Sequence, residues 1–154
     1  MIKHGKWYRL WAVLLVLCLL PGCAASDQTT QDAARYKVAV VAKSTQTDFW
    51  KAVFVGAEAA ATEYNLELTI DGPDTEEDYE AQNQMIEDAV ADGAQALVFS
   101  AIDYDANAPA IEKAAEKGVK IVVIDSAVNS QNVAAYIGTD NYSAGMMAAR
   151  AALE

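Results

Sequence analysis

The chain has 154 residues, of which 53% are hydrophobic, and a formal net charge of −11. This length suits one ordinary domain, and the hydrophobic content is sufficient for a core. The acidic balance argues against nucleic acid and anionic lipid surfaces as partners, because both carry negative charge themselves.

Residues 1–22 have the pattern of an export signal, a positive start followed by an apolar run at residues 10–20. This run is well short of the roughly 20 residues that span a bilayer, so a permanent transmembrane helix is disfavoured. The ending Leu20-Pro21-Gly22-Cys23 resembles the lipobox of bacterial lipoproteins. The resemblance implies cleavage before Cys23 and a lipid on its sulfur. An ordinary secretory signal with an incidental cysteine is the alternative.

Removal of this signal changes the charge and the thiol content. The 11 basic residues fall to 8 when Lys3, Lys6 and Arg9 leave, so that against 22 acidic residues the mature charge is −14. Cys18 leaves as well and Cys23 carries lipid, so no disulfide framework is expected. Residues 23–35 are small and polar, which predicts a lipid-anchored tether. The folded domain is then residues 36–154, at the outer face of the bacterial cytoplasmic membrane or in the periplasm.

Strands and helices are predicted to alternate along this domain. A strand from Lys37 runs into a polar loop at 43–50, and helical spacing follows from Phe49, with Asp48 as N-cap and Asn65 as the end. The further predicted strands are 66–71, 96–100, 119–125 and 133–137. Acidic residues lie at the start of the second predicted helix, and Gly93 ends it. The third has Pro109 in its first turn and ends at Gly118. A last helix carries Met146 and Met147, which are assigned to the core.

This alternation predicts an α/β fold, a right-handed, doubly wound parallel sheet with strand order 2-1-3-4-5. In such sheets ligands bind outside the carboxyl ends of the strands, beside the first strand. The loops at 43–50, 100–105, 125–126 and 139–141 are therefore expected around one cleft.

Several chemistries are excluded by what the cleft lacks. The single histidine, His4, lies in the signal, so no mature histidine serves as a general base or metal ligand. The 43–50 loop contains no glycine, so nucleotide phosphates have no backbone cradle, and Lys43 stands where a magnesium or phospho-accepting site needs acidic residues. We expect neither an enzyme nor a cofactor or metal. The remaining Asp, Asn, Thr and Ser side chains with paired aromatics suit a neutral polyhydroxyl ligand.

The run Val-Ala-Val-Val-Ala-Lys-Ser-Thr-Gln-Thr-Asp-Phe-Trp with Gly56-Ala57 resembles the opening of ribose- and galactose-type (type I) periplasmic solute-binding proteins, whose sheet also occurs in lac-repressor-family effector domains. Asp92-Gly93-Ala94, Ser100-Ala-Ile-Asp103, residues 118–125 and residues 139–145 follow the same family in the same order. The resemblance covers about residues 37–154. It implies the first lobe of a two-lobed protein, in truncated form, which alone is expected to bind sugar weakly or not at all.

By that resemblance the cleft positions are Thr47, Phe49, Trp50, Asp125 and Ser126, with Asp140 and Asn141 nearby. Two departures from the family pattern bear on which sugar is bound. Gln46-Thr47-Asp48 replaces the Asn-Asn-Pro of pentose binders, and Ser126 replaces the arginine that usually follows the strand-four aspartate.

Each site residue has a structural alternative. Asp125 is the strongest ligand candidate, because a carboxylate that ends an apolar strand needs partners. Phe49 either stacks on the ligand or packs in the core, while Trp50, off the apolar stripe, is assigned to the cleft. Lys43 contacts the ligand or extends from a strand end into solvent.

The other acidic candidates have capping as their main alternative. Asp103 and Asp105 are expected as helix caps, with Asp103 also a candidate hydroxyl acceptor. Asp140 and Asn141 are divided between capping the last helix and forming the hinge or cleft rim.

The resulting hypothesis is a lipid-anchored receptor that captures a sugar or polyol and presents it to the permease of an ABC-type importer. A sugar-sensing ectodomain protein that signals to a membrane kinase or chemoreceptor, without transport, is the alternative.

Overall fold

The computed structural model describes residues 34–154, which form one compact unit. The predicted export signal and Cys23, the predicted lipidation site, lie outside the described residues, as does most of the predicted tether. Within residues 34–154 no helix is both long enough and apolar enough to cross a membrane.

Five parallel strands form a single sheet in the order β2-β1-β3-β4-β5, which confirms the predicted topology. The strands are β1 (Lys37–Val41), β2 (Glu67–Asp71), β3 (Ala96–Phe99), β4 (Lys120–Ile124) and β5 (Val133–Ile137). Val41 pairs with Phe99, and Phe99 pairs with Val123, so the three central strands end level with one another. The residues that follow them are thereby brought to one edge.

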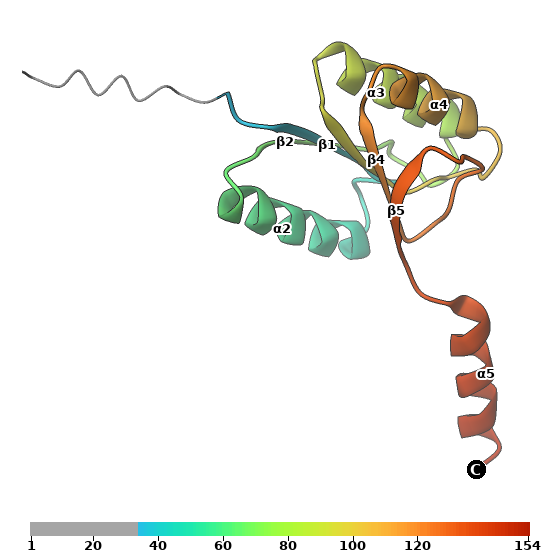
Figure 1. Ribbon diagram of the computed structural model, residues 1–154. Helices are drawn as coiled ribbons and strands as arrows, with labels where there is room; N and C mark the ends of the chain where they lie inside the picture. Colours follow the sequence, from blue (N-terminus) through green and yellow to red (C-terminus); the bar gives the residue numbers. More distant parts are fainter. Residues whose placement is uncertain (1–33) are drawn as a thin grey trace, which may run out of the picture. The chain divides into compact units, whose positions relative to one another are not determined.

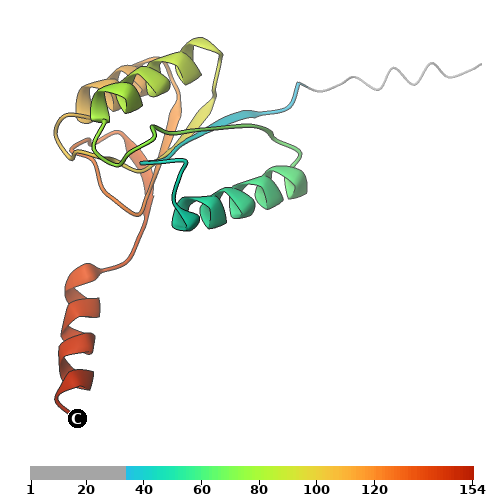
Figure 2. The same ribbon diagram turned by 180° about the vertical axis from the view of Figure 1, so that it is seen from behind.

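Helices cover both faces of this sheet (Figures 1 and 2). Helix α2 (Asp48–Glu63) lies on one face, and α3 (Tyr79–Ala91) and α4 (Ala108–Glu116) lie together on the other. This arrangement follows from right-handed crossovers on either side of β1, where the chain changes direction across the sheet.

The main core lies between the sheet and the α3/α4 pair. Strand residues that alternate along β1, β3 and β4 point toward it, because successive side chains of a strand face opposite sides. Its larger members are Val41, Ile86, Leu97, Phe99, Ile111, Ile121 and Val123, all at most 1% exposed. Burial of this kind contributes roughly 1.5–3 kcal/mol for each large apolar side chain, before the entropy of ordering is subtracted.

Most of the predicted helix ends are observed. Asn65, just beyond α2, has φ 51°, and Gly93 and Gly118 each have φ 87°, so all three adopt the left-handed conformation that ends a helix. Pro109 lies in the first turn of α4, as predicted. The N-cap of α2 was predicted wrongly by one residue. It is Thr47, which has the extended backbone of a cap and accepts a hydrogen bond from the Trp50 N–H, whereas Asp48 is already helical.

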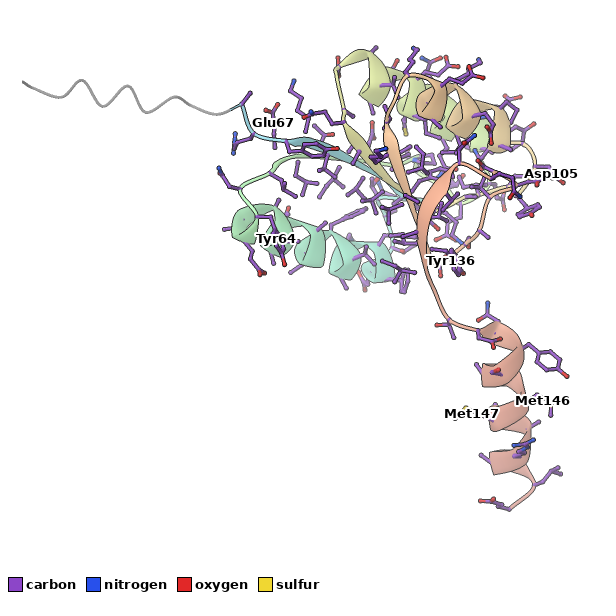
Figure 3. The ribbon with its side chains drawn as sticks, viewed as in Figure 1. Tyr64, Glu67, Asp105, Tyr136, Met146 and Met147 are labelled. Carbon is purple, nitrogen blue, oxygen red and sulfur yellow. The ribbon has the colours of Figure 1, made fainter. Side chains whose placement is uncertain are left out.

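Two other expectations need correction. The acidic residues before α3 form a loop, and only Asp78 joins the helix, as its N-cap. Met146 and Met147 are not core residues: they lie on α5 (Asn141–Ala152; Figure 3) with 42% and 70% of their surface exposed. Every residue of α5 is exposed in the described unit, because no other element covers it.

Candidate functional site

Four polar side chains meet beyond the carboxyl ends of β1, β3 and β4. Lys43 follows β1, Ser100 follows β3, and Asp125 with Ser126 follows β4. The Lys43 ammonium lies 3.2 Å from the Asp125 carboxylate and donates a hydrogen bond of 2.9 Å to the Ser126 hydroxyl. That hydroxyl donates in turn to Asp125 at 2.9 Å, and the Ser100 hydroxyl donates to the same carboxylate oxygen at 3.4 Å. We call these four residues the strand-end cluster.

Asp125 holds an unusual backbone conformation, with φ 57° in the left-handed region. For a residue other than glycine this costs roughly 1–2 kcal/mol, so neighbouring contacts must hold it. Its N–H donates to the Ile137 carbonyl at 3.0 Å, and its carbonyl accepts from the hydroxyl of Tyr136 on β5 at 2.8 Å (Figure 3). Both the N–H and the carbonyl of Asp125 are therefore hydrogen-bonded to β5.

The electrostatics of the cluster favour an ionised Asp125. Partial burial acts to raise its pKa, but hydrogen bonds from Ser126 and Lys43, the Lys43 charge and the Ser100 hydroxyl together outweigh this and lower the pKa below 3.8. The side chain remains 41% exposed, so an ionised, partly open carboxylate is available to accept hydrogen bonds.

The two aromatic residues at the start of α2 differ in burial: Trp50, assigned to the cleft, is buried, and Phe49, divided between ligand and core, is exposed. Trp50 is 1% exposed and is the only buried residue of α2, whereas Phe49 is 59% exposed. Their rings meet edge to face, with centroids 5.0 Å apart and an interplanar angle of 84°. Of the two, only Phe49 presents an open ring face that could cover a ligand, although the ligand contacts of both remain predictions.

The remaining predicted site residues have local roles in the described unit. Asp103 accepts hydrogen bonds from the N–H groups of Asp105 and Ala106, so it stabilises the turn before α4, while the N-cap position itself is Asn107. The expectation that Asp103 and Asp105 cap this helix is therefore wrong, because the N-cap lies after both of them, at Asn107.

Asp140 is the N-cap of α5, which is one of the two roles predicted for it, and Asn141 is the first residue of that helix. Hydrogen bonds from the Ser143 side chain and backbone N–H lower the pKa of Asp140 below 3.8. No hydrogen bond among residues 34–154 joins Asp103, Asp140 or Asn141 to the strand-end cluster.

Gln82 supports the site and was missed by the sequence analysis. Its side chain is fully buried, donates to the carbonyls of Ala42 at 2.8 Å and Ser100 at 2.9 Å, and accepts from the Ile102 N–H at 3.1 Å. It therefore binds the ends of β1 and β3 together directly behind the cluster. Its position one turn before Ile86, on the apolar stripe of α3, was the available signal.

Glu76 was also missed, because it lies in the acidic run interpreted as a solvated helix start. Its carboxylate accepts a hydrogen bond of 2.7 Å from the Trp50 indole N–H, and it lies 3.8 Å from the Lys43 ammonium. Residues 34–154 hold no group of three or more acidic, histidine or cysteine side chains placed to bind a metal ion.

Comparisons with known proteins show the family to which this chain is similar. The periplasmic binding protein domain family matches residues 38–154. The D-ribose/D-allose-binding protein of Pseudomonas aeruginosa is 30% identical over 142 residues, which cover 86% of this chain and 44% of that protein. The ribose import binding protein of Bacillus subtilis is 26% identical over 137 residues, with 88% and 44% covered. The chain thus spans less than half the length of these relatives.

Solved structures show the same fold. A carbohydrate transporter solute-binding protein from Agrobacterium radiobacter, in complex with D-arabinose, has a TM-score of 0.73 and 29% identity over 77% of this chain and 40% of its own. An ABC transporter solute-binding protein from Agrobacterium vitis, with bound D-fucose, has a TM-score of 0.71 and 34% identity over 75% and 41%. By the extent of the family match and the shared sheet, this chain belongs to the periplasmic binding protein domain family, with the type I fold.

Proposed function

We propose that the protein captures a sugar or related polyol outside the cytoplasm and presents it to the permease of an ABC-type importer. The observation that carries this proposal is the strand-end cluster, in which Asp125 is ionised and partly open at the ligand-binding edge of a doubly wound sheet. A carboxylate accepts hydrogen bonds from adjacent sugar hydroxyls, each contributing roughly 1.5–3 kcal/mol when charge-assisted.

The cluster also supplies donors for the same ligand. Lys43 and Ser126 lie beside Asp125 and carry N–H and O–H groups that can reorient toward a sugar oxygen. The exposed phenyl ring of Phe49 covers the apolar C–H face of the sugar, and the buried Trp50 packs against Phe49. In the proposed site Thr47, Asp103 and Asn141 add polar contacts, and Asp140 lies at its hinge or rim.

The relatives support a sugar as the ligand class. Those compared above are named as ribose or ribose/allose binders, or are solved with D-arabinose or D-fucose. Because this chain spans less than half their length, its own ligand and its permease are part of the proposal. One lobe provides only part of the contacts of a closed two-lobed site. Of the two outcomes expected from the sequence, weak binding or none, we propose weak binding, because the strand-end cluster lies within this chain.

Saturation-transfer NMR with the full chain tests the ligand class, since it detects weak binding. We expect transfer to at least one of D-ribose, D-allose, D-arabinose and D-fucose at millimolar concentration, and its loss in Asp125→Asn. Asp88→Asn is the matched control, because its exposed side chain lies on α3 and accepts a hydrogen bond from Gln84, not from a residue of the strand-end cluster. Absence of transfer from every sugar, or equal loss in both variants, would contradict the proposal.

We further propose that Cys23 carries the lipid that holds the protein at the membrane. Its support is the sequence pattern alone, since Cys23 lies outside the described residues. Metabolic labelling with a fatty-acid analogue in a bacterial host is expected to mark the wild type and not Cys23→Ser. Equal labelling of both would refute the anchor without affecting the sugar site.

A further inference from the structure

We propose that Glu76 is a positioning residue of the sugar site, which fixes the Trp50 ring behind Phe49 and shares the Lys43 ammonium with Asp125. The role as part of a sugar site rests on the proposed function, whereas the contacts themselves do not. Glu76 lies in the loop between β2 and α3, whereas Trp50 lies on α2 and Asp125 directly after β4.

The first step is the indole of Trp50. This ring is 1% exposed, and its N–H is the only hydrogen-bond donor of the side chain. Glu76 Oε1 accepts that N–H at 2.7 Å, a short and charge-assisted contact. A buried donor without an acceptor is strongly unfavourable, so this bond fixes the orientation of the Trp50 ring, which meets the Phe49 ring at an interplanar angle of 84°.

The second step is the ammonium of Lys43. Its side chain is 19% exposed and lies between two carboxylates, Asp125 at 3.2 Å and Glu76 at 3.8 Å. Two negative charges and one positive charge leave a net charge of about −1 in this group. A site with this balance favours a neutral polyol over a sugar acid, because an anionic ligand would be repelled.

The loop that carries Glu76 is held by hydrogen bonds to the first binding loop. Three contacts tie residues 72–78 to the first binding loop: Thr45 N–H to the Pro73 carbonyl at 3.2 Å, the Ser44 hydroxyl to the Asp74 carbonyl at 3.2 Å, and the Gln46 amide to the Asp74 carboxylate at 3.3 Å. Gly72 permits this approach, since a Cβ there would lie 3.1 Å from the Ala42 carbonyl oxygen. The loop is therefore held in place independently of Glu76.

Tryptophan fluorescence tests the positioning role without any sugar. The chain has three tryptophans, so the full chain with Trp7→Phe and Trp11→Phe reports on Trp50 alone. In this background we expect Glu76→Ala to shift the emission to longer wavelength and to increase quenching by acrylamide. Glu77→Ala is the matched control and should behave as the parent. Glu76→Gln should keep Trp50 protected, because its amide oxygen still accepts the indole N–H.

Circular dichroism separates a local change from unfolding. Unchanged Trp50 emission and quenching in a folded Glu76→Ala variant would overturn the proposal. If Glu76→Ala does not fold, the near-isosteric Glu76→Gln decides: a folded Gln variant with protected Trp50 supports the hydrogen bond, and one with exposed Trp50 contradicts it.

The sugar experiment supplies the second arm. Glu76→Gln removes the negative charge beside Lys43, so the net charge of this group changes from about −1 to about 0. Binding of a uronic acid should gain relative to its neutral parent sugar, and an unchanged ratio of the two would contradict the charge argument. If the wild type binds no sugar while Glu76→Ala exposes Trp50, the proposed function fails and the positioning role stands.

Discussion

The two faces of the sheet are covered in different ways, although the same strands supply both. On the α3/α4 face the strand side chains are buried, and α4, only nine residues long, buries Ala110, Ile111 and Ala114. On the other face α2 has 16 residues but buries only Trp50, and Ile124 of β4 is half-buried. Helix length is therefore a poor guide to anchoring, which depends on the apolar stripe that a helix presents.

The strand-end cluster depends on this difference. Its strands are fixed by the densely packed face, whereas Phe49 and Trp50, the aromatic residues proposed for the sugar site, lie on the sparsely packed helix. Trp50 is the point where α2 is anchored, so a residue assigned to the ligand by its sequence position also holds its helix to the sheet.

Truncation of one isoleucine on each face gives the largest expected effect. Ile121 and Ile124 both belong to β4 but face opposite sides, with Ile121 1% exposed and Ile124 half-buried. We expect Ile121→Ala to lower the free energy of unfolding by roughly 2–5 kcal/mol, through lost burial and a cavity, and Ile124→Ala to cost clearly less. Urea unfolding of the full chain measures both. Equal losses would contradict the unequal packing of the faces.

The next effect concerns Gln82, the polar residue within the packed face. Gln82→Met keeps the length of the side chain but leaves two carbonyls and one N–H without their partner. We expect a loss of about 2 kcal/mol or more, since each buried unsatisfied group costs roughly 1–3 kcal/mol. Gln84→Met, on the exposed side of the same helix, is the control and should change stability by less than about 0.5 kcal/mol. Similar values for the two variants would show that the Gln82 bonds add no net stability.

Backbone strain at Asp125 gives a smaller effect. At φ 57° the backbone of alanine is strained and that of glycine is not. We therefore expect Asp125→Gly to be about 1 kcal/mol more stable than Asp125→Ala. Both variants lose the carboxylate equally, and their difference therefore isolates the backbone. Asn65, with φ 51° after α2, should show the same order of stability for glycine and alanine. Denaturant midpoints measured side by side decide, and an alanine variant as stable as glycine would refute the strain.

Much of the fold was predictable because its signals are local. Apolar runs marked the strands, and Gly93, Gly118 and Asn65 marked helix ends through their tolerance of positive φ. The burial of Phe49 and Trp50 was not predictable in this way. Thr47 and Asp48 are both good caps, and a shift of one residue turns a helix by about 100°. That rotation exchanges which aromatic residue faces the sheet.

The candidate site was predictable only where strand ends alone define it. Lys43 follows β1, and Asp125 with Ser126 follows β4 on the other side of β3; the three were expected together. Glu76 and Gln82 reach the site through the fold of the β2–α3 loop and the facing of α3, which depend on distant contacts. Likewise, the apolar character of Met146 and Met147 does not reveal whether a covering surface lies within the described unit.

The smallest expected effect is a pH dependence that belongs to the cluster. Because the pKa of Asp125 in the folded protein lies below its unfolded value of 3.8, its contribution to stability is complete above 3.8 and is lost as the pH falls through the folded value. The stability difference between wild type and Asp125→Asn should therefore be constant near neutral pH and shrink in acid. We expect less than about 1 kcal/mol, since the side chain is 41% exposed and solvent screens the pair. The same comparison in a Lys43→Met background removes one of the main causes of the lowered Asp125 pKa, so the stability difference should then depend less on pH. An unchanged pH dependence would assign the ionisation of Asp125 to its hydroxyl partners instead.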